Sequence, residues 1–124
     1  MEKQPFSIKD RIRSFRYAGQ GFISLISSEH NSWIHLFIAG CVIGAGFIWE
    51  ISITEWCLIV LCIGGVLAAE GFNSAIEALS DKVSRDRDPL IGKAKDIAAF
   101  SVLIMCLASI CVGLLIFFPK WIGK

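Results

Sequence analysis

The sequence predicts an all-α membrane protein, a single domain over 1–124 with three transmembrane helices and one surface helix. Hydrophobic residues make up 55% of the chain, a larger share than a soluble domain usually carries. The charged residues are sorted by position, and long uncharged runs such as 97–118 lie between them. Because about 20 apolar residues are needed to cross a bilayer as a helix, these runs favour membrane spans.

The N-terminal segment, 1–28, is expected to form an amphipathic surface helix. Apolar side chains recur at helical spacing between Ile8 and Ile26. Basic side chains lie on the flanks and on the other face: Lys9, Arg11, Arg13 and Arg16. This pattern is typical of a helix that lies in the membrane interface, and a helix packed on its own soluble domain is the alternative.

Three segments are expected to cross the bilayer: 33–49, 54–81 and 97–118. The first begins and ends with tryptophan, as in the aromatic belts of membrane proteins. It also contains Gly40 and Gly44, a GxxxG pattern typical of close helix packing. Between the second and third spans, 82–95 is expected to be a polar loop, because Pro89 excludes a continuous central helix there.

The positions of the basic residues predict the orientation in the membrane. All lysines and arginines except Lys120 and Lys124 precede the first span or lie between the second and third. The positive-inside rule assigns both of these regions to the cytoplasm. The N-terminus is therefore expected on the cytoplasmic side.

Composition and motif content argue against several classes of function. The net charge of +1 gives no overall bias toward nucleic acid. The five cysteines lie inside apolar runs with no CxxC pair, so they are expected to be small buried side chains rather than disulfides or zinc ligands. The phosphate-binding pattern GxxxxGK[ST] does not occur in the sequence.

Polar side chains follow the second apolar run along one face of its helix. Five of them fall within about 100° of one another at 3.6 residues per turn; they are Glu70, Asn73, Ser74, Glu77 and Asp81. Acids at membrane depth are unfavourable unless they face water, a partner or a metal. This polar stripe is therefore the first candidate for a functional site.

Phosphoryl transfer suits these residue types. It needs carboxylates that hold Mg²⁺ and a base that accepts the proton of the attacking hydroxyl. Glu29 and Glu77, at the cytoplasmic boundary, are candidates for the metal. Glu70 is the candidate base, because helix rise places it about 10 Å further into the membrane than Glu77.

Structural roles are the alternatives for several of these residues. Asn73 is open to a role as an interhelical hydrogen-bond partner. Glu77 is open to a salt bridge with Lys93 or Lys95. The charged run 85–88 is open to being a solvated loop.

At these residues the sequence resembles the prokaryotic diacylglycerol kinases and their relatives, the undecaprenol kinases. The resemblance covers about 13–118. It is carried by Glu70-x-x-Asn73-Ser74-Ala75-Ile76-Glu77-x-x-x-Asp81 and by Gly92-Lys93-Ala94-Lys95-Asp96-Ile97-Ala98-Ala99. It implies a homotrimer with active sites shared between subunits, located in the bacterial cytoplasmic (inner) membrane, with ATP as phosphoryl donor and Mg²⁺ as cofactor.

The resemblance also implies residue roles. Glu70 would be the catalytic base, and Glu29 and Glu77 would hold the metal. The expected nucleotide contacts are Tyr17, Glu29, Asn73, Glu77, Asp86, Arg87, Asp88, Lys95 and Asp96. The expected substrate contacts are Glu70, Trp33 and Ala99.

Some positions depart from the family pattern. Trp33 stands where many relatives carry arginine, and Asp10 stands where one branch carries a substrate-contacting arginine. The arrangement Glu29, Asn31 and His35 looks more like the undecaprenol-kinase branch.

The implied activity is ATP-dependent phosphorylation of diacylglycerol to phosphatidic acid. Undecaprenol phosphorylation is the alternative, and a non-enzymatic small membrane subunit that packs through its GxxxG face is the second alternative.

Overall fold

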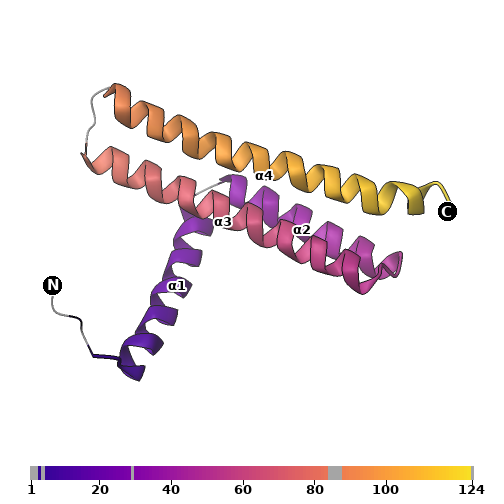
Figure 1. Cartoon of the computed structure of the whole chain (residues 1–124), viewed down its shortest axis with the longest axis horizontal. Helices are drawn as coiled ribbons and strands as arrows, with labels where there is room; N and C mark the ends of the chain where they lie inside the picture. Colours follow the sequence, from indigo (N-terminus) through magenta and orange to yellow (C-terminus); the bar gives the residue numbers. More distant parts are fainter. Residues whose placement is uncertain (1–2, 4, 29, 84–87, 124) are drawn as a thin grey trace.

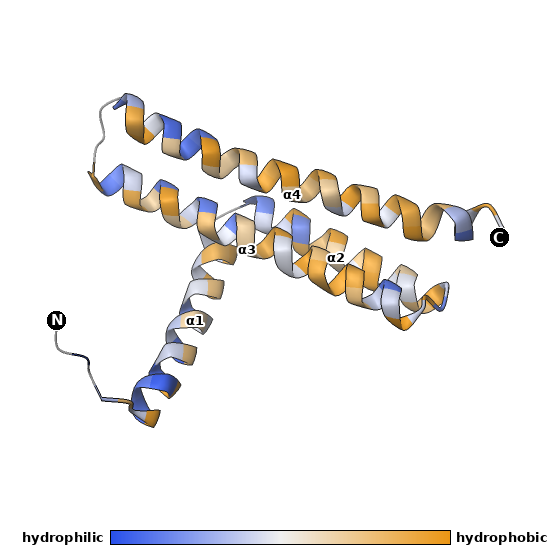
Figure 2. Cartoon of the chain, viewed as in Figure 1, coloured by the Kyte–Doolittle hydropathy of each residue, from blue (hydrophilic) through white to orange (hydrophobic). Residues whose placement is uncertain are grey.

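The computed structural model describes residues 3, 5–28, 30–83 and 88–123. These residues form four helices, α1 (Ile8–Ser28), α2 (His30–Ile48), α3 (Ile53–Val83) and α4 (Pro89–Trp121), and no strand occurs among them. The last three are long and apolar enough to cross a membrane. Their apolar residues occupy most of their length, as the colouring in Figure 2 shows. The predicted all-α membrane protein is confirmed.

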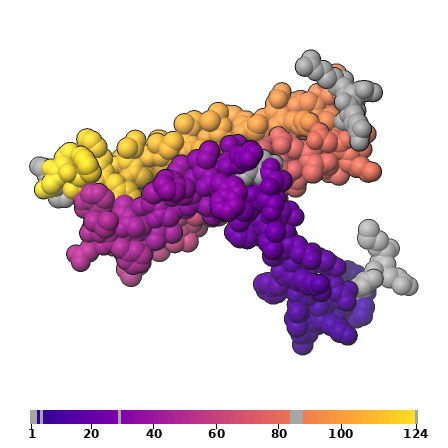
Figure 3. Space-filling model, turned by 180° about the vertical axis from the view of Figure 1, so that it is seen from behind, coloured from indigo at the N-terminus to yellow at the C-terminus, as the bar shows by residue number. Residues whose placement is uncertain are grey.

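Helices α2, α3 and α4 form a bundle from which α1 departs at a steep angle (Figure 1). Helix α4 lies alongside α3, and α2 packs against α3 at the end that is distant from the α3–α4 connection. Helix α1 contacts the bundle where it joins α2 and otherwise stands apart from it (Figure 3).

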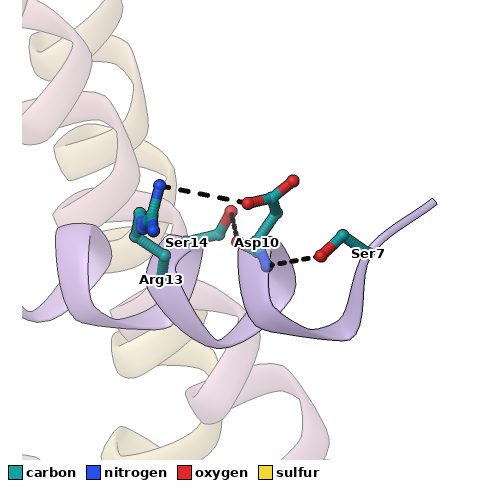
Figure 4. Close-up of polar contacts among 4 residues, drawn as sticks. All are labelled: Ser7, Asp10, Arg13 and Ser14. Carbon is teal, nitrogen blue, oxygen red and sulfur yellow. Dashed lines mark hydrogen bonds and ion pairs between the residues drawn. The ribbon is translucent and has the colours of Figure 1, made fainter. Parts of the chain in front are cut away.

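The start of α1 is fixed by short-range polar contacts (Figure 4). The backbone N–H of Asp10 donates to Oγ of Ser7 at 3.4 Å, so the serine satisfies one of the free donors of the first turn. Arg13 lies 4.0 Å from the Asp10 carboxylate, an exposed pair of small energetic weight. No residue of α1 is buried, and its basic side chains and its apolar side chains up to Ile23 are exposed on the single chain.

Large apolar side chains also cover the outside of the bundle. Phe37, Phe47, Ile53 and Leu115 are all more than two-thirds exposed. Such a surface is unfavourable in water and suits hydrocarbon or other apolar helices. Three of the five cysteines, Cys41, Cys57 and Cys111, are exposed on this surface, so the expectation of buried cysteines is wrong for them.

The core lies at the end of the bundle that contains the α2–α3 turn. Its buried members are Ile51, Ile59 and Ile116. Ser52 and Glu55 cap the start of α3 reciprocally, with hydrogen bonds of 2.9 and 3.2 Å. Lys120 of α4 lies 3.2 Å from Glu55, which joins the two helices at this end.

The glycines that are closely approached by a neighbouring helix are not the expected ones but Gly46 and Gly65, which face Trp56 and Met105. A Cβ at Gly46 would lie 2.7 Å from the Trp56 ring, so only glycine fits there. Gly40 and Gly44 are exposed, and a Cβ at either would meet nothing within 4 Å among the described residues. The GxxxG pattern therefore does not mediate packing between the described helices of one chain.

The expected polar loop over 82–95 is wrong at both ends. Helix α3 continues to Val83, and α4 already begins at Pro89. Proline is favourable in a first turn, because its missing N–H would have no helical partner there. Asp88 caps the helix, with Oδ1 accepting from the N–H groups of Leu90 and Ile91 at 2.8 and 3.2 Å. The residues 89–95 are therefore the first turns of α4 and not part of a loop.

Candidate functional site

The centre of the candidate site is a buried carboxylate on α3. Glu70 is 5% exposed, and its Oε1 lies 3.0 Å from Nε2 of His35 on α2. The two side chains are 6% and 21% exposed, so the contact is largely shielded from solvent. A buried carboxylate is unfavourable without a hydrogen-bond donor, and the imidazole supplies one.

From Glu70 to Glu77 the polar stripe of α3 faces inward, whereas the side chain of Asp81 at its end is 70% exposed. Asn73 and Glu77 are half-buried, whereas Phe72 and Leu79 are 72% and 66% exposed. The Oδ1 atom of Asn73 is buried with no hydrogen-bond partner among the described residues. Its carbonyl oxygen is thus an available acceptor or ligand, and it makes no interhelical hydrogen bond within the described chain.

Helices α3 and α4 are joined near this site by an ion pair. Lys95 Nζ lies 2.9 Å from Oδ1 of Asp81. Glu77 is near enough to Lys95 to interact with its charge, but no ion pair forms between them among the described residues. The alternative that Glu77 forms a structural bridge with Lys93 or Lys95 is therefore wrong for this chain. Asp81, one turn further along α3, takes that role.

The other expected site residues lie on the surface of the single chain. Tyr17 and Trp33 are 61% and 60% exposed, and Asp96 and Ala99 are also exposed. Where the chain is described, no hydrogen bond or ion pair joins any of them to Glu70. Glu29, Asp86 and Arg87 lie outside the described residues.

The functional class is given by similarity to known proteins. The family model described as prokaryotic diacylglycerol kinase matches residues 16–117. The chain belongs to this family. The match includes the polar stripe, the Glu70–His35 pair and the Asp81–Lys95 ion pair.

Curated relatives within this kinase family carry two different names. Undecaprenol kinase of Bacillus subtilis is 41% identical over 108 residues, which cover 87% of this chain and 88% of the relative. Diacylglycerol kinase of Haemophilus influenzae is 32% identical over 108 residues, which cover 86% and 92% of the two chains. Diacylglycerol kinase of Pseudomonas aeruginosa is 28% identical over 123 residues, covering 91% of this chain and the whole relative.

The residues of this kinase suit Mg²⁺ by the chemistry of their donors. Mg²⁺ prefers oxygen ligands, and Glu77 and the unpartnered Oδ1 of Asn73 supply two on one face of α3. Three or more His, Cys, Asp or Glu side chains do not come together in the described ranges. A complete shell therefore needs further oxygens, for which phosphate groups and Glu29 are the candidates.

The contact between Glu70 and His35 is one that the sequence pattern does not predict. The sequence contains one signal for this contact: apart from Cys41, His35 is the only titratable residue in the apolar segment 33–49. His35 also lines a cavity of about 430 Å³ between α2, α3 and α4, whose other walls are mainly apolar and extend to Phe117. Glu70 thus pairs with a side chain that borders an apolar space.

Asp88 allows a direct test of structural against nucleotide-binding roles. We expect Asp88→Ala to lower the stability of the folded protein by about 1 kcal/mol, because the cap of α4 is lost. Asp88→Asn keeps a capping oxygen and should leave stability nearly unchanged. Thermal unfolding in detergent measures the first effect, and the KM for ATP measured on both variants detects a nucleotide role.

The two roles of Asp88 give different patterns. If the side chain acts only as a cap, the asparagine variant keeps the parental KM for ATP. A raised KM in Asp88→Asn with unchanged stability would indicate a contact that requires the charge. Equal destabilisation by alanine and asparagine would contradict the capping role.

Proposed function

We propose that this membrane lipid kinase phosphorylates the hydroxyl of undecaprenol, with ATP as the phosphoryl donor. The observation that carries the choice of acceptor is the 41% identity with B. subtilis undecaprenol kinase over 87% of this chain. Diacylglycerol, converted to phosphatidic acid, is the second candidate. It is favoured by the description of the family model and by the 32% identical H. influenzae relative.

Glu70 is the proposed catalytic base. Its described hydrogen bond uses Oε1, which leaves the second carboxylate oxygen to accept from an acceptor hydroxyl. The hydroxyl proton passes to Glu70 while the alcohol oxygen forms its bond to the γ-phosphorus. The bond between that phosphorus and the bridging oxygen breaks, and ADP leaves with the electron pair.

The nucleotide is proposed to bind at the end of the bundle where α3 and α4 are connected. Polar residues gather at this end (Figure 2). The residues proposed to contact the nucleotide are Tyr17, Glu29, Asn73, Glu77, Asp86, Arg87, Asp88, Lys95 and Asp96. Glu29 and Glu77 would hold Mg²⁺, which when bound offsets the negative charge of the phosphates. Trp33 and Ala99 are proposed to contact the lipid.

The proposed assembly is a homotrimer in the bacterial cytoplasmic membrane, with the N-terminus in the cytoplasm. The distribution of lysine and arginine supports this orientation. The exposure of Tyr17, Asp96 and Ala99 on one chain supports an active site that a second copy completes. The apolar outer surface of the bundle offers both a lipid-facing and a subunit-facing side. The segment 1–28 is proposed to lie on the membrane surface.

A transfer assay with defined acceptors tests the proposal. Purified protein in detergent receives labelled ATP, Mg²⁺ and either undecaprenol or diacylglycerol alone. We expect labelled undecaprenyl phosphate, formed at a higher kcat/KM than phosphatidic acid. A clear preference for diacylglycerol would establish the second candidate. Transfer to neither lipid by folded protein would contradict the kinase activity and favour a non-enzymatic packing subunit.

A further inference from the structure

His35 is a polar side chain in an otherwise apolar stretch of α2, and its ring is used for one described contact. Its Nε2 atom lies 3.0 Å from Oε1 of Glu70, across the interface between α2 and α3. The imidazole is 21% exposed and the carboxylate 6%. A hydrogen bond of this length between largely buried groups is strongly favoured over leaving either group unpaired.

We propose that His35 is a positioning residue for the catalytic base. When Nε2–H donates to Oε1, the carboxylate plane is fixed and the free oxygen, Oε2, is left to accept the hydroxyl proton. The inference rests on the proposed role of Glu70 and adds the group that orients it. An orienting donor behind a general base is a recurring element of catalytic sites, because a base must be held within hydrogen-bond reach of the proton it accepts.

The proton balance of this arrangement is simple. The imidazole keeps its own proton throughout, and the hydroxyl proton passes to Oε2 of Glu70. The carboxyl group is then neutral and still accepts from Nε2–H through Oε1. When the product leaves, the carboxyl proton passes to water and the pair returns to its starting state. No oxidant, reductant or further reactant is needed.

The groups around the Glu70–His35 pair determine how freely the Glu70 carboxylate can turn. His35 and Cys106 line the apolar cavity between the three bundle helices, and the Cys106 thiol is within range of the charge of Glu70. A thiol is only a weak hydrogen-bond donor. Among the described residues, His35 is the strong donor that reaches Glu70. Without it the carboxylate is free to rotate about its last side-chain bonds, and fewer of its orientations present an oxygen to the acceptor.

Three substitutions at position 35 separate a positioning role from a packing role. His35→Gln keeps an amide N–H at about the reach of Nε2 and restores the donor. His35→Asn is polar but shorter, so its amide does not reach Oε1. His35→Leu removes the donor and keeps an apolar side chain of adequate size. We expect kcat with undecaprenol to fall by about 10- to 100-fold in the leucine and asparagine variants, in the range measured for other orienting partners.

The glutamine variant provides the rescue. We expect His35→Gln to retain most of the parental kcat, and the KM for ATP to change by less than about twofold in all three variants, because His35 contacts Glu70 and is not itself one of the expected nucleotide contacts. A packing role predicts a different order, in which loss of activity follows loss of thermal stability and the asparagine and glutamine variants behave alike. Unchanged kcat in His35→Leu would overturn the inference.

A double-mutant cycle keeps the test decisive if His35→Leu folds poorly. In the Glu70→Gln background the base is absent, so His35→Asn should not reduce the residual transfer rate further. An equal fold-loss in both backgrounds would show that the histidine acts independently of Glu70. Failure of the parental protein to phosphorylate any lipid would instead refute the proposed function, and the two failures are therefore distinguishable.

Discussion

Glu70→Gln is expected to reduce phosphoryl transfer by about 10²- to 10⁴-fold, the usual contribution of a general base. Glutamine has the shape of glutamate, and its amide oxygen can still accept from Nε2 of His35, which lies 3.0 Å from Oε1 in the parental protein. What the variant loses is the capacity to take a proton. Rates of labelled phosphate incorporation into undecaprenol measure the effect directly.

The alternative role of Glu70 is structural, and the same variant tests it. If the buried acid serves only assembly, Glu70→Gln would alter the oligomeric state in detergent and leave transfer per folded molecule unchanged. We expect the opposite, with an unchanged elution volume and unchanged ATP binding. The control is Glu55→Gln on the same helix, because Glu55 pairs with Lys120 at the far end of the bundle. That variant should retain the parental transfer rate.

The three apolar helices were predictable from the sequence because length and absence of charge suffice to define a span. The residues at which the helices begin and end were less predictable. The charged run 85–88 and Pro89 suggest a loop, yet Asp88 accepts from two backbone N–H groups and lets α4 start at Pro89. A capping side chain allows a helix to begin directly after a charged run, because it satisfies donors that would otherwise be free. Likewise, GxxxG spacing does not reveal which glycines meet a partner, and within this chain Gly46 and Gly65, both outside that pattern, are closely approached by Trp56 and Met105.

The candidate site was predictable along one helix and not between helices. The periodicity of 3.6 places Glu70, Asn73 and Glu77 on one face, and the structure shows that this face is turned inward. The pairing of Glu70 with His35 depends on how far α2 is shifted along α3, which no local pattern specifies. The same limit applies to Lys95 of α4. Its ion-pair partner is Asp81, which lies one helical turn beyond Glu77 on α3.

Glu77→Gln is expected to lower kcat/KM for MgATP by about 10²- to 10³-fold, since a metal ion stabilises the charge of the transferred phosphoryl group by several kcal/mol. Glutamine keeps one oxygen ligand and removes the negative charge that attracts Mg²⁺. Because Glu77 is half-buried on the inward face of α3 and makes no ion pair among the described residues, its carboxylate is available for this role. Transfer measured over a range of Mg²⁺ concentrations checks the expectation.

A metal role and a structural role of Glu77 respond differently to added cation. If the carboxylate binds Mg²⁺, the loss in Glu77→Gln is partly reversed at high Mg²⁺, because mass action offsets weaker binding. Asp81→Asn is the matched control, one turn further along α3, where the carboxylate pairs with Lys95 at 2.9 Å. That exposed pair contributes little to stability, so its loss should leave the Mg²⁺ dependence unchanged. An identical Mg²⁺ dependence in Glu77→Gln and the parental protein would exclude Glu77 as a metal ligand and leave the metal to other carboxylates.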